Sequence, residues 1–124
     1  MTSQTFPNST DSVRRARRFV ADELQDIPHV APAAVAAVSE LATNCVLHTS
    51  SEFTIEVTRA STGVRVDVTD HGSGHPVRKD PSALETGGRG LSIVDALTDK
   101  WGVRINTGSK TVWFEISLVE TPTR

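Results

Sequence analysis

Apolar residues recur with a helical period over residues 11–26. At 100° per residue they fall on one stripe, and arginines occupy the opposite side. The stripe consists of Val13, Ala16, Val20, Leu24 and Ile27. This pattern predicts an amphipathic helix, capped by Thr10 or Asp11 and ended by Pro28.

Two further helices are predicted. Pro32 suits the first turn of a more apolar helix over about residues 33–48. Helical spacing then recurs at Leu91, Val94, Leu97 and Trp101. Gly102 is the expected end of this third helix.

Strict alternation of apolar and polar residues predicts strands elsewhere. The alternating runs lie at 53–57, 64–68, 103–106 and 111–118, and a short leading strand at 4–6 has weaker support. Helices grouped apart from consecutive strand pairs predict an α+β two-layer sandwich. We expect about three helices on one face of a mixed, mainly antiparallel sheet of four to five strands.

Length and composition narrow the classes of protein. The 124 residues suit a single domain spanning 1–124. A net charge of −2 gives no overall attraction to nucleic acid or to an anionic membrane. No apolar run reaches the length of a membrane span, and the polar start does not resemble a signal peptide. With only Cys45 as a thiol, these features indicate a cytoplasmic protein.

A row of polar residues interrupts the second predicted helix. Glu40, Asn44 and His48 recur every four residues and therefore share one face. A carboxylate, an amide and an imidazole in one row can serve as base, metal ligand and phosphate contact. The alternative is a solvated stripe opposite the core, although such stripes more often carry lysines.

A second polar feature ends the strand at 64–68. Asp70 shares the parity of the three valines in that run, so its carboxylate should point toward the covered face of the sheet. A buried carboxylate needs a hydrogen-bond partner, from the protein or from a ligand. Gly72 and Gly74 follow and allow another molecule to approach closely, although an ordinary Asp-Gly turn also fits.

A third feature precedes the last predicted helix. Residues 71–90 hold five glycines and two prolines, which predicts a long loop. Its final residues, Gly87-Gly88-Arg89-Gly90, lead directly into Leu91. Glycines that expose backbone N–H groups at a helix N-terminus can bind phosphate, and Arg89 would add charge.

The three features together resemble a known family. Glu40-Leu41-x-x-Asn44-x-x-x-His48 resembles the N-box, Asp70-x-Gly72-x-Gly74 the first glycine box, and Gly88-x-Gly90-Leu91 the second glycine box. These motifs occur in the gyrase, heat-shock-protein-ninety and histidine-kinase ATPases, whose fold is the Bergerat-type ATP-binding fold. The short lid and the arginine-rich start of the chain are most similar to bacterial anti-sigma factor serine kinases. At this length we do not expect the phosphoacceptor helices of a complete sensor histidine kinase.

The resemblance implies a site for ATP and Mg²⁺ between the helices and the sheet. Asn44 would coordinate Mg²⁺, and Glu40 would be the catalytic base toward an acceptor hydroxyl. Asp70 would accept a hydrogen bond from the adenine amino group, and His48 would lie near the phosphates.

The glycine boxes receive roles in the same way. Gly72 and Gly74 would make room for the purine. Gly88, Arg89 and Gly90 would wrap the phosphates, with Leu91 completing that motif.

Two positions depart from the family pattern. Thr86 stands where some of these kinases carry a basic residue, which leaves Arg89, Arg78 or Lys79 to stabilise the γ-phosphate. Strand parity places Lys110 where the family often has a threonine beside adenine. These departures favour ATP binding over phosphotransfer.

The implied function is that of an ATP-binding regulatory serine kinase. It would bind a sigma factor and phosphorylate an antagonist, or anti-anti-sigma, protein on a serine, and a homodimer is left open. The alternative is a non-catalytic, ATP-dependent module that controls its partners through its lid.

Other readings of the chain have less support. The run Arg14-Arg15-x-Arg17-Arg18 could contact nucleic acid, but nearby aspartates and the lack of an aromatic series favour a solvated or protein-binding face. A loop metal site formed by Asp70, His71 and His75 matches no standard zinc spacing. Cys45 has the helical spacing of a core residue.

Overall fold

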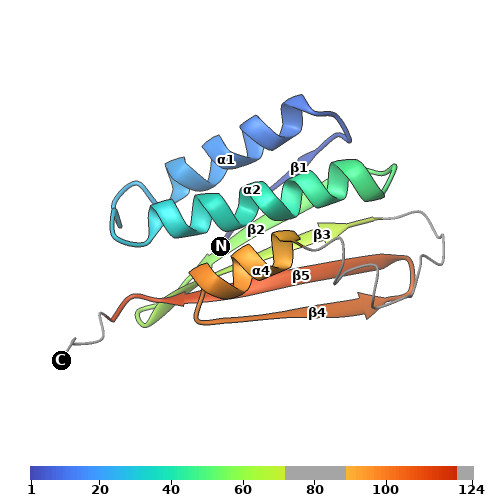
Figure 1. Ribbon diagram of the computed structural model, residues 1–124. Helices are drawn as coiled ribbons and strands as arrows, with labels where there is room; N and C mark the ends of the chain where they lie inside the picture. The colour runs from blue at the N-terminus through green and yellow to red at the C-terminus, as the bar shows by residue number, and fades with distance from the viewer. Residues whose placement is uncertain (72–88, 120–124) are drawn as a thin grey trace.

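The computed structural model describes residues 1–71 and 89–119, and its elements form two layers (Figure 1). In chain order they are β1 (Thr2–Phe6), α1 (Asp11–Glu23), α2 (Ala31–His48), β2 (Phe53–Arg59), β3 (Gly63–Asp70), α4 (Arg89–Leu97), β4 (Lys100–Asn106) and β5 (Ser109–Ser117). The three helices cover one face of a five-stranded sheet. The predicted α+β two-layer sandwich is confirmed. None of the described helices is both long and apolar enough to cross a membrane.

The sheet has the strand order β1-β2-β3-β5-β4, and each neighbouring pair is antiparallel. The expected parallel component is therefore wrong for the strands described here. The leading strand exists and begins at Thr2, earlier than its alternation indicates. Gly108 adopts a φ of 80° in the turn between β4 and β5, a conformation that glycine takes without steric strain.

The hydrophobic core lies between the helices and the inner face of the sheet. Phe6, Phe53 and Phe114 are among its largest fully buried side chains. The rings of Phe6 and Phe53 stack at 5.5 Å between centroids and connect β1 to β2. Because strand parity places every second residue of β2 and β3 in this core, the alternation in the sequence identified the covered face correctly.

The ends of two helices differ from the predictions. α1 ends at Glu23, and the expected side-chain cap at its start is absent because Thr10 makes no cap hydrogen bond. The third helix ends at Leu97, so the prediction that it reaches Trp101 is wrong. Trp101 lies on β4, where its indole Nε1 donates a hydrogen bond of 2.8 Å back to Asp95 on α4.

The outer face of the sheet is dominated by paired polar groups around Trp113. The Arg65 guanidinium lies 4.4 Å from the centre of the Trp113 ring and also bonds Asp67 and Glu115. A Cβ on Gly102 of β4 would meet the same ring at 2.7 Å. Trp113 is thus a half-buried residue whose ring packs against Arg65 and Gly102.

We expect Gly102→Val to destabilise the fold by about 1–3 kcal/mol, because the new side chain must push the Trp113 indole out of its position. The free energy of unfolding from urea titration measures this effect. Gly108→Asn is the matched control in the adjoining turn, since asparagine tolerates a positive φ and nothing lies within 4 Å of the position. Equal losses in both variants would contradict the predicted clash.

Candidate functional site

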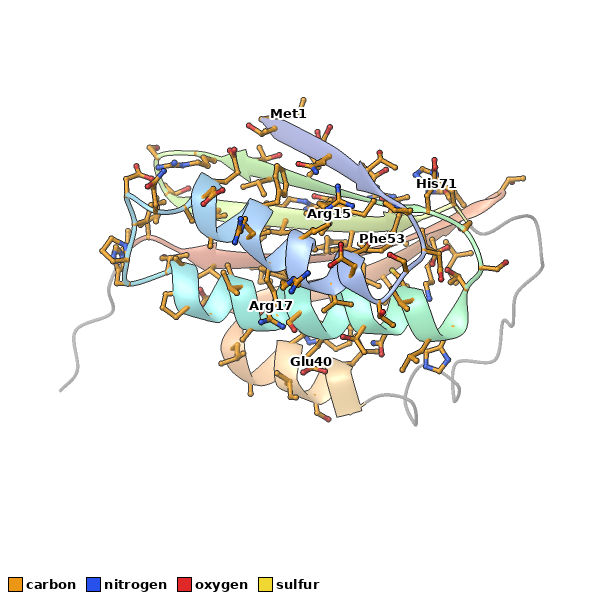
Figure 2. All side chains as sticks on the ribbon, turned by 90° about the horizontal axis from the view of Figure 1, so that it is seen from above. Met1, Arg15, Arg17, Glu40, Phe53 and His71 are labelled. Atoms are coloured by element: carbon orange, nitrogen blue, oxygen red, sulfur yellow. The ribbon has the colours of Figure 1, made fainter. Side chains whose placement is uncertain are left out.

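The polar row on α2 lies at different depths along the helix. Glu40 and Asn44 are half-buried, whereas His48 in the last turn is exposed. The residues through which α2 enters the core lie beside this row and are Ala34, Ala37, Val38, Leu41, Ala42 and Cys45. α2 also packs against α4, and Glu40 projects from α2 on the α4 side (Figure 2). Partial burial of Glu40 and Asn44 distinguishes them from a fully solvated stripe.

Asp70 is the last residue of β3 and faces the helical layer, as its parity predicts. It is 4% exposed. In the antiparallel ladder, Lys110 on β5 lies directly opposite, with its Nζ 3.8 Å from Oδ2 of Asp70. Phe53 on β2 pairs with Asp70 from the other side and is fully buried. The carboxylate therefore lies at the edge of the core, beside an ammonium group.

Cys45 connects this strand end with α2. Burial is the main cause that raises the pKa of its thiol to about 12; the negative charge of Asp70 raises it further, and Lys110 opposes the shift. The thiol thus lies within electrostatic reach of the Asp70–Lys110 pair. Cys45 is a core residue, as its spacing predicts, and its neighbour Asn44 belongs to the polar row.

A raised pKa makes Cys45 unreactive in the native protein. At pH 8 we expect negligible thiolate and therefore slow labelling by a disulfide reagent, with rapid labelling in denaturant, where the thiol regains its ordinary pKa. Because the folded-state pKa exceeds the unfolded one, the stability that the buried thiol provides is complete below pH 9 and declines as the pH rises toward 12. Labelling at equal rates in native and denatured protein would contradict this.

Only part of the glycine-rich region lies within the described residues. α4 begins at Arg89, two residues before the predicted start at Leu91, so the end of the second glycine box forms the first turn of the helix. Leu91 is buried in that turn. The remaining predicted residues of this region lie outside the described residues: Gly72, Gly74, His75, Arg78, Lys79, Thr86 and Gly88. Their assigned roles stay predictions.

The alternative loop metal site of Asp70, His71 and His75 includes a histidine, His75, that lies outside the described residues. Among the described residues there is no group of three metal-ligating side chains. Nε2 of His71 lies 3.0 Å from Oγ1 of Thr54 on β2. His71 is thus engaged on the outer face of the sheet, the face opposite to Asp70.

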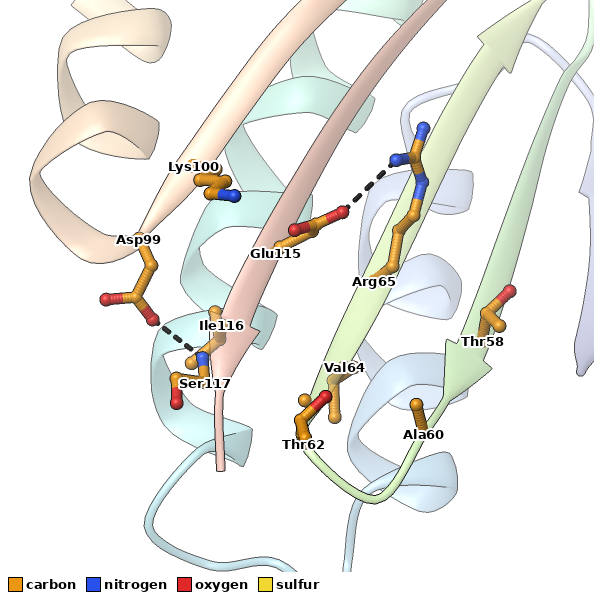
Figure 3. A pocket seen from close by; sticks show the side chains of 11 residues that line it. Thr58, Ala60, Thr62, Val64, Arg65, Asp99, Lys100, Glu115, Ile116 and Ser117 are labelled. Carbon is orange, nitrogen blue, oxygen red and sulfur yellow. Dashed lines mark hydrogen bonds and ion pairs between the residues drawn. The ribbon is translucent and has the colours of Figure 1, made fainter. Parts of the chain in front are cut away.

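A hollow of about 380 Å³ lies at the far end of β3 from Asp70 (Figure 3). Arg65 bonds Glu115 there, and the Asp99 carboxylate accepts a hydrogen bond of 2.6 Å from the backbone N–H of Ser117. Lys100 also lines the hollow.

The two-layer fold, the half-buried row on α2 and the buried aspartate that ends β3 are the parts of the predicted site that the structure describes. Residues 6–116 match the model of the histidine kinase-like ATPase domain. The chain belongs to this family. None of the curated proteins compared with the chain matches it significantly.

Solved structures share the fold at low sequence identity. The RsbU and RsbW domains of Rv1364c from Mycobacterium tuberculosis superpose with a TM-score of 0.70 and 19% identity, over 94% of this chain and 32% of that one. The Acinetobacter baumannii histidine kinase AdeS gives 0.60 and 13%, over 97% and 69%. The SiaB–SiaC complex from Pseudomonas aeruginosa gives 0.60 and 13%, over 94% and 89%. The chain thus spans about a third of the first of these structures.

Proposed function

We propose that this chain binds ATP with Mg²⁺ between α2, α4 and the sheet, and transfers the γ-phosphoryl group to a serine of an antagonist protein. A sigma factor is the proposed second partner. The observation that carries the proposal is that the buried Asp70 at the end of β3 lies within electrostatic reach of Cys45 on α2, the residue next to Asn44, in a chain of the histidine kinase-like ATPase family.

The residues present fit the nucleotide and its metal. Asp70 would supply a buried acceptor for the amino group of adenine. The phosphates would bind at the N-terminus of α4, where the backbone N–H groups of the first turn point out of the helix. Asn44 offers one half-buried amide oxygen. One protein oxygen suits Mg²⁺, which usually takes its other ligands from phosphates and water. When bound, the metal would neutralise charge on the phosphates.

Glu40 is the proposed general base. It lies one helical turn from Asn44 on the same face of α2, so a substrate hydroxyl placed near the metal-bound phosphate would lie within its reach. The serine oxygen would form the new bond to the γ-phosphorus while the bond to the ADP oxygen breaks, and Glu40 would take the hydroxyl proton. Alignment of the incoming oxygen by a carboxylate is the usual contribution of such a base.

The structural neighbours support a function that depends on partner proteins. One of them contains an RsbW domain together with an RsbU domain, and another is a complex of SiaB with SiaC. By analogy, an antagonist protein is the proposed acceptor for this chain.

Transfer of labelled γ-phosphate to a candidate antagonist tests the proposal. Glu40→Gln should reduce transfer at least about 100-fold and leave ATP affinity within a factor of two, because a base acts on the reaction and not on nucleotide binding. Glu56→Gln, on β2, is the matched control and should keep full activity. Tight ATP binding by the wild type without transfer to any acceptor would instead support the non-catalytic binding module. No binding of ATP with or without Mg²⁺ would overturn both functions.

A further inference from the structure

The pairing of Asp70 with Lys110 gives the buried strand end a donor as well as an acceptor. The Asp70 side chain is 6% exposed and that of Lys110 is 29% exposed. At 3.8 Å, the distance from Nζ to Oδ2 exceeds the usual range of a hydrogen bond. The ammonium is therefore held beside the carboxylate by charge, and its N–H groups can still point to a third group.

The position of Lys110 is fixed by the sheet. It lies directly opposite Asp70 in the β3–β5 ladder, on the same face, and both charges act on Cys45 of α2. A base bound to Asp70 would therefore lie next to the Lys110 ammonium. This step rests on the proposed nucleotide site.

We propose that Lys110 is a specificity-determining residue that donates a hydrogen bond to N1 of adenine while Asp70 accepts one from the N6 amino group. On the Watson–Crick edge of adenine the N6 donor and the N1 acceptor lie side by side, because both are bonded to C6. Asp70 and Lys110 present the complementary acceptor and donor side by side. In the same pose, guanine would direct its O6 at the carboxylate and its N1–H at the ammonium, so both contacts would be repulsive.

A direct contact to N1 differs in its consequences from a merely structural ion pair. Removal of a structural ion pair weakens the binding of every nucleotide by the same factor, since the pocket changes for all of them. Removal of a contact to N1 weakens the binding of a nucleotide that carries N1 and not of one that lacks it, so the ratio of their affinities changes. The decisive quantity is therefore a ratio of two affinities.

The test uses ATP and 1-deaza-ATP, in which a C–H group replaces N1, with dissociation constants from calorimetric titration. We expect the wild type to bind ATP at least about tenfold more tightly than the analogue, as loss of a hydrogen bond from a charged donor implies. In Lys110→Met the ratio should fall to about one. Lys100→Met, an exposed lysine on β4, is the matched control and should keep the wild-type ratio.

Thermal melting without nucleotide establishes that each variant is folded. If Lys110→Met keeps the wild-type ratio, or if the wild type does not distinguish the two nucleotides, Lys110 does not contact N1 and the inference is overturned while ATP binding stands. If the wild type binds neither nucleotide, the proposed function itself fails. The two failures are thus distinguishable.

Discussion

Asp70→Asn is expected to weaken ATP binding at least about tenfold. The substitution replaces a charged acceptor with a neutral amide, and Lys110 loses the negative charge beside it. Hydrogen bonds to charged groups contribute about 1.5–3 kcal/mol, and 1.4 kcal/mol corresponds to a factor of ten in affinity. Because the site is buried, water compensates poorly for the lost contact. Calorimetric titration with ATP and Mg²⁺ gives the change in dissociation constant.

Asp67→Asn is the matched control for this experiment. It makes the same chemical change three residues earlier on β3, on the outer face, where Asp67 bonds Arg65. It should therefore leave ATP affinity within a factor of two. If the two variants weaken ATP equally, the effect of Asp70→Asn comes from the strand or from net charge, and the assignment of Asp70 to the base is wrong.

The sequence predicted those parts of the site that depend on local periodicity. Asp70 follows the parity of three buried valines, and the alternation of a strand is enough to direct its carboxylate inward. Glu40 and Asn44 share a helix face because their spacing equals about one turn. Parity likewise placed Lys110 on the face of Asp70.

Long-range features were beyond the reach of the sequence. No local pattern specifies that β3 pairs with β5 in the register that sets Lys110 opposite Asp70, because strand order depends on the whole fold. At Trp101 a local pattern gave a wrong prediction, because this residue continues the helical spacing but lies on a strand. The helix has ended before it: the Thr98 hydroxyl donates a hydrogen bond to the Val94 carbonyl, and the Asp99 N–H donates one to the Glu115 carbonyl on β5.

The site and the core meet at Phe53. This residue pairs with Phe6 on one side and with Asp70 on the other, so one buried ring supports both the edge of the sheet and the proposed base-binding end of β3. A change in the core at this position should therefore affect stability and nucleotide binding together. The two effects can be separated because the stability that a bound ligand adds depends only on its concentration and its dissociation constant.

Phe53→Ala should lower the free energy of unfolding by about 3–5 kcal/mol, because it leaves a cavity beside the stacked Phe6 ring. That is a large share of the 5–15 kcal/mol typical of small domains. Urea titration without nucleotide measures the loss. ATP at 100 times the wild-type dissociation constant should restore about 2.7 kcal/mol if the variant binds ATP with wild-type affinity, and less if its affinity is lower.

Phe19→Ala provides the comparison within the same aromatic cluster. Phe19 meets Phe6 edge-on at 6.1 Å between ring centroids but is only half-buried. Water can fill most of the space that its ring leaves, so the substitution creates little cavity. We expect at most about half the loss caused by Phe53→Ala, with ATP affinity unchanged because α1 lies away from β3. If Phe19→Ala costs as much as Phe53→Ala, or weakens ATP equally, Phe53 has no special part in joining the core to the site.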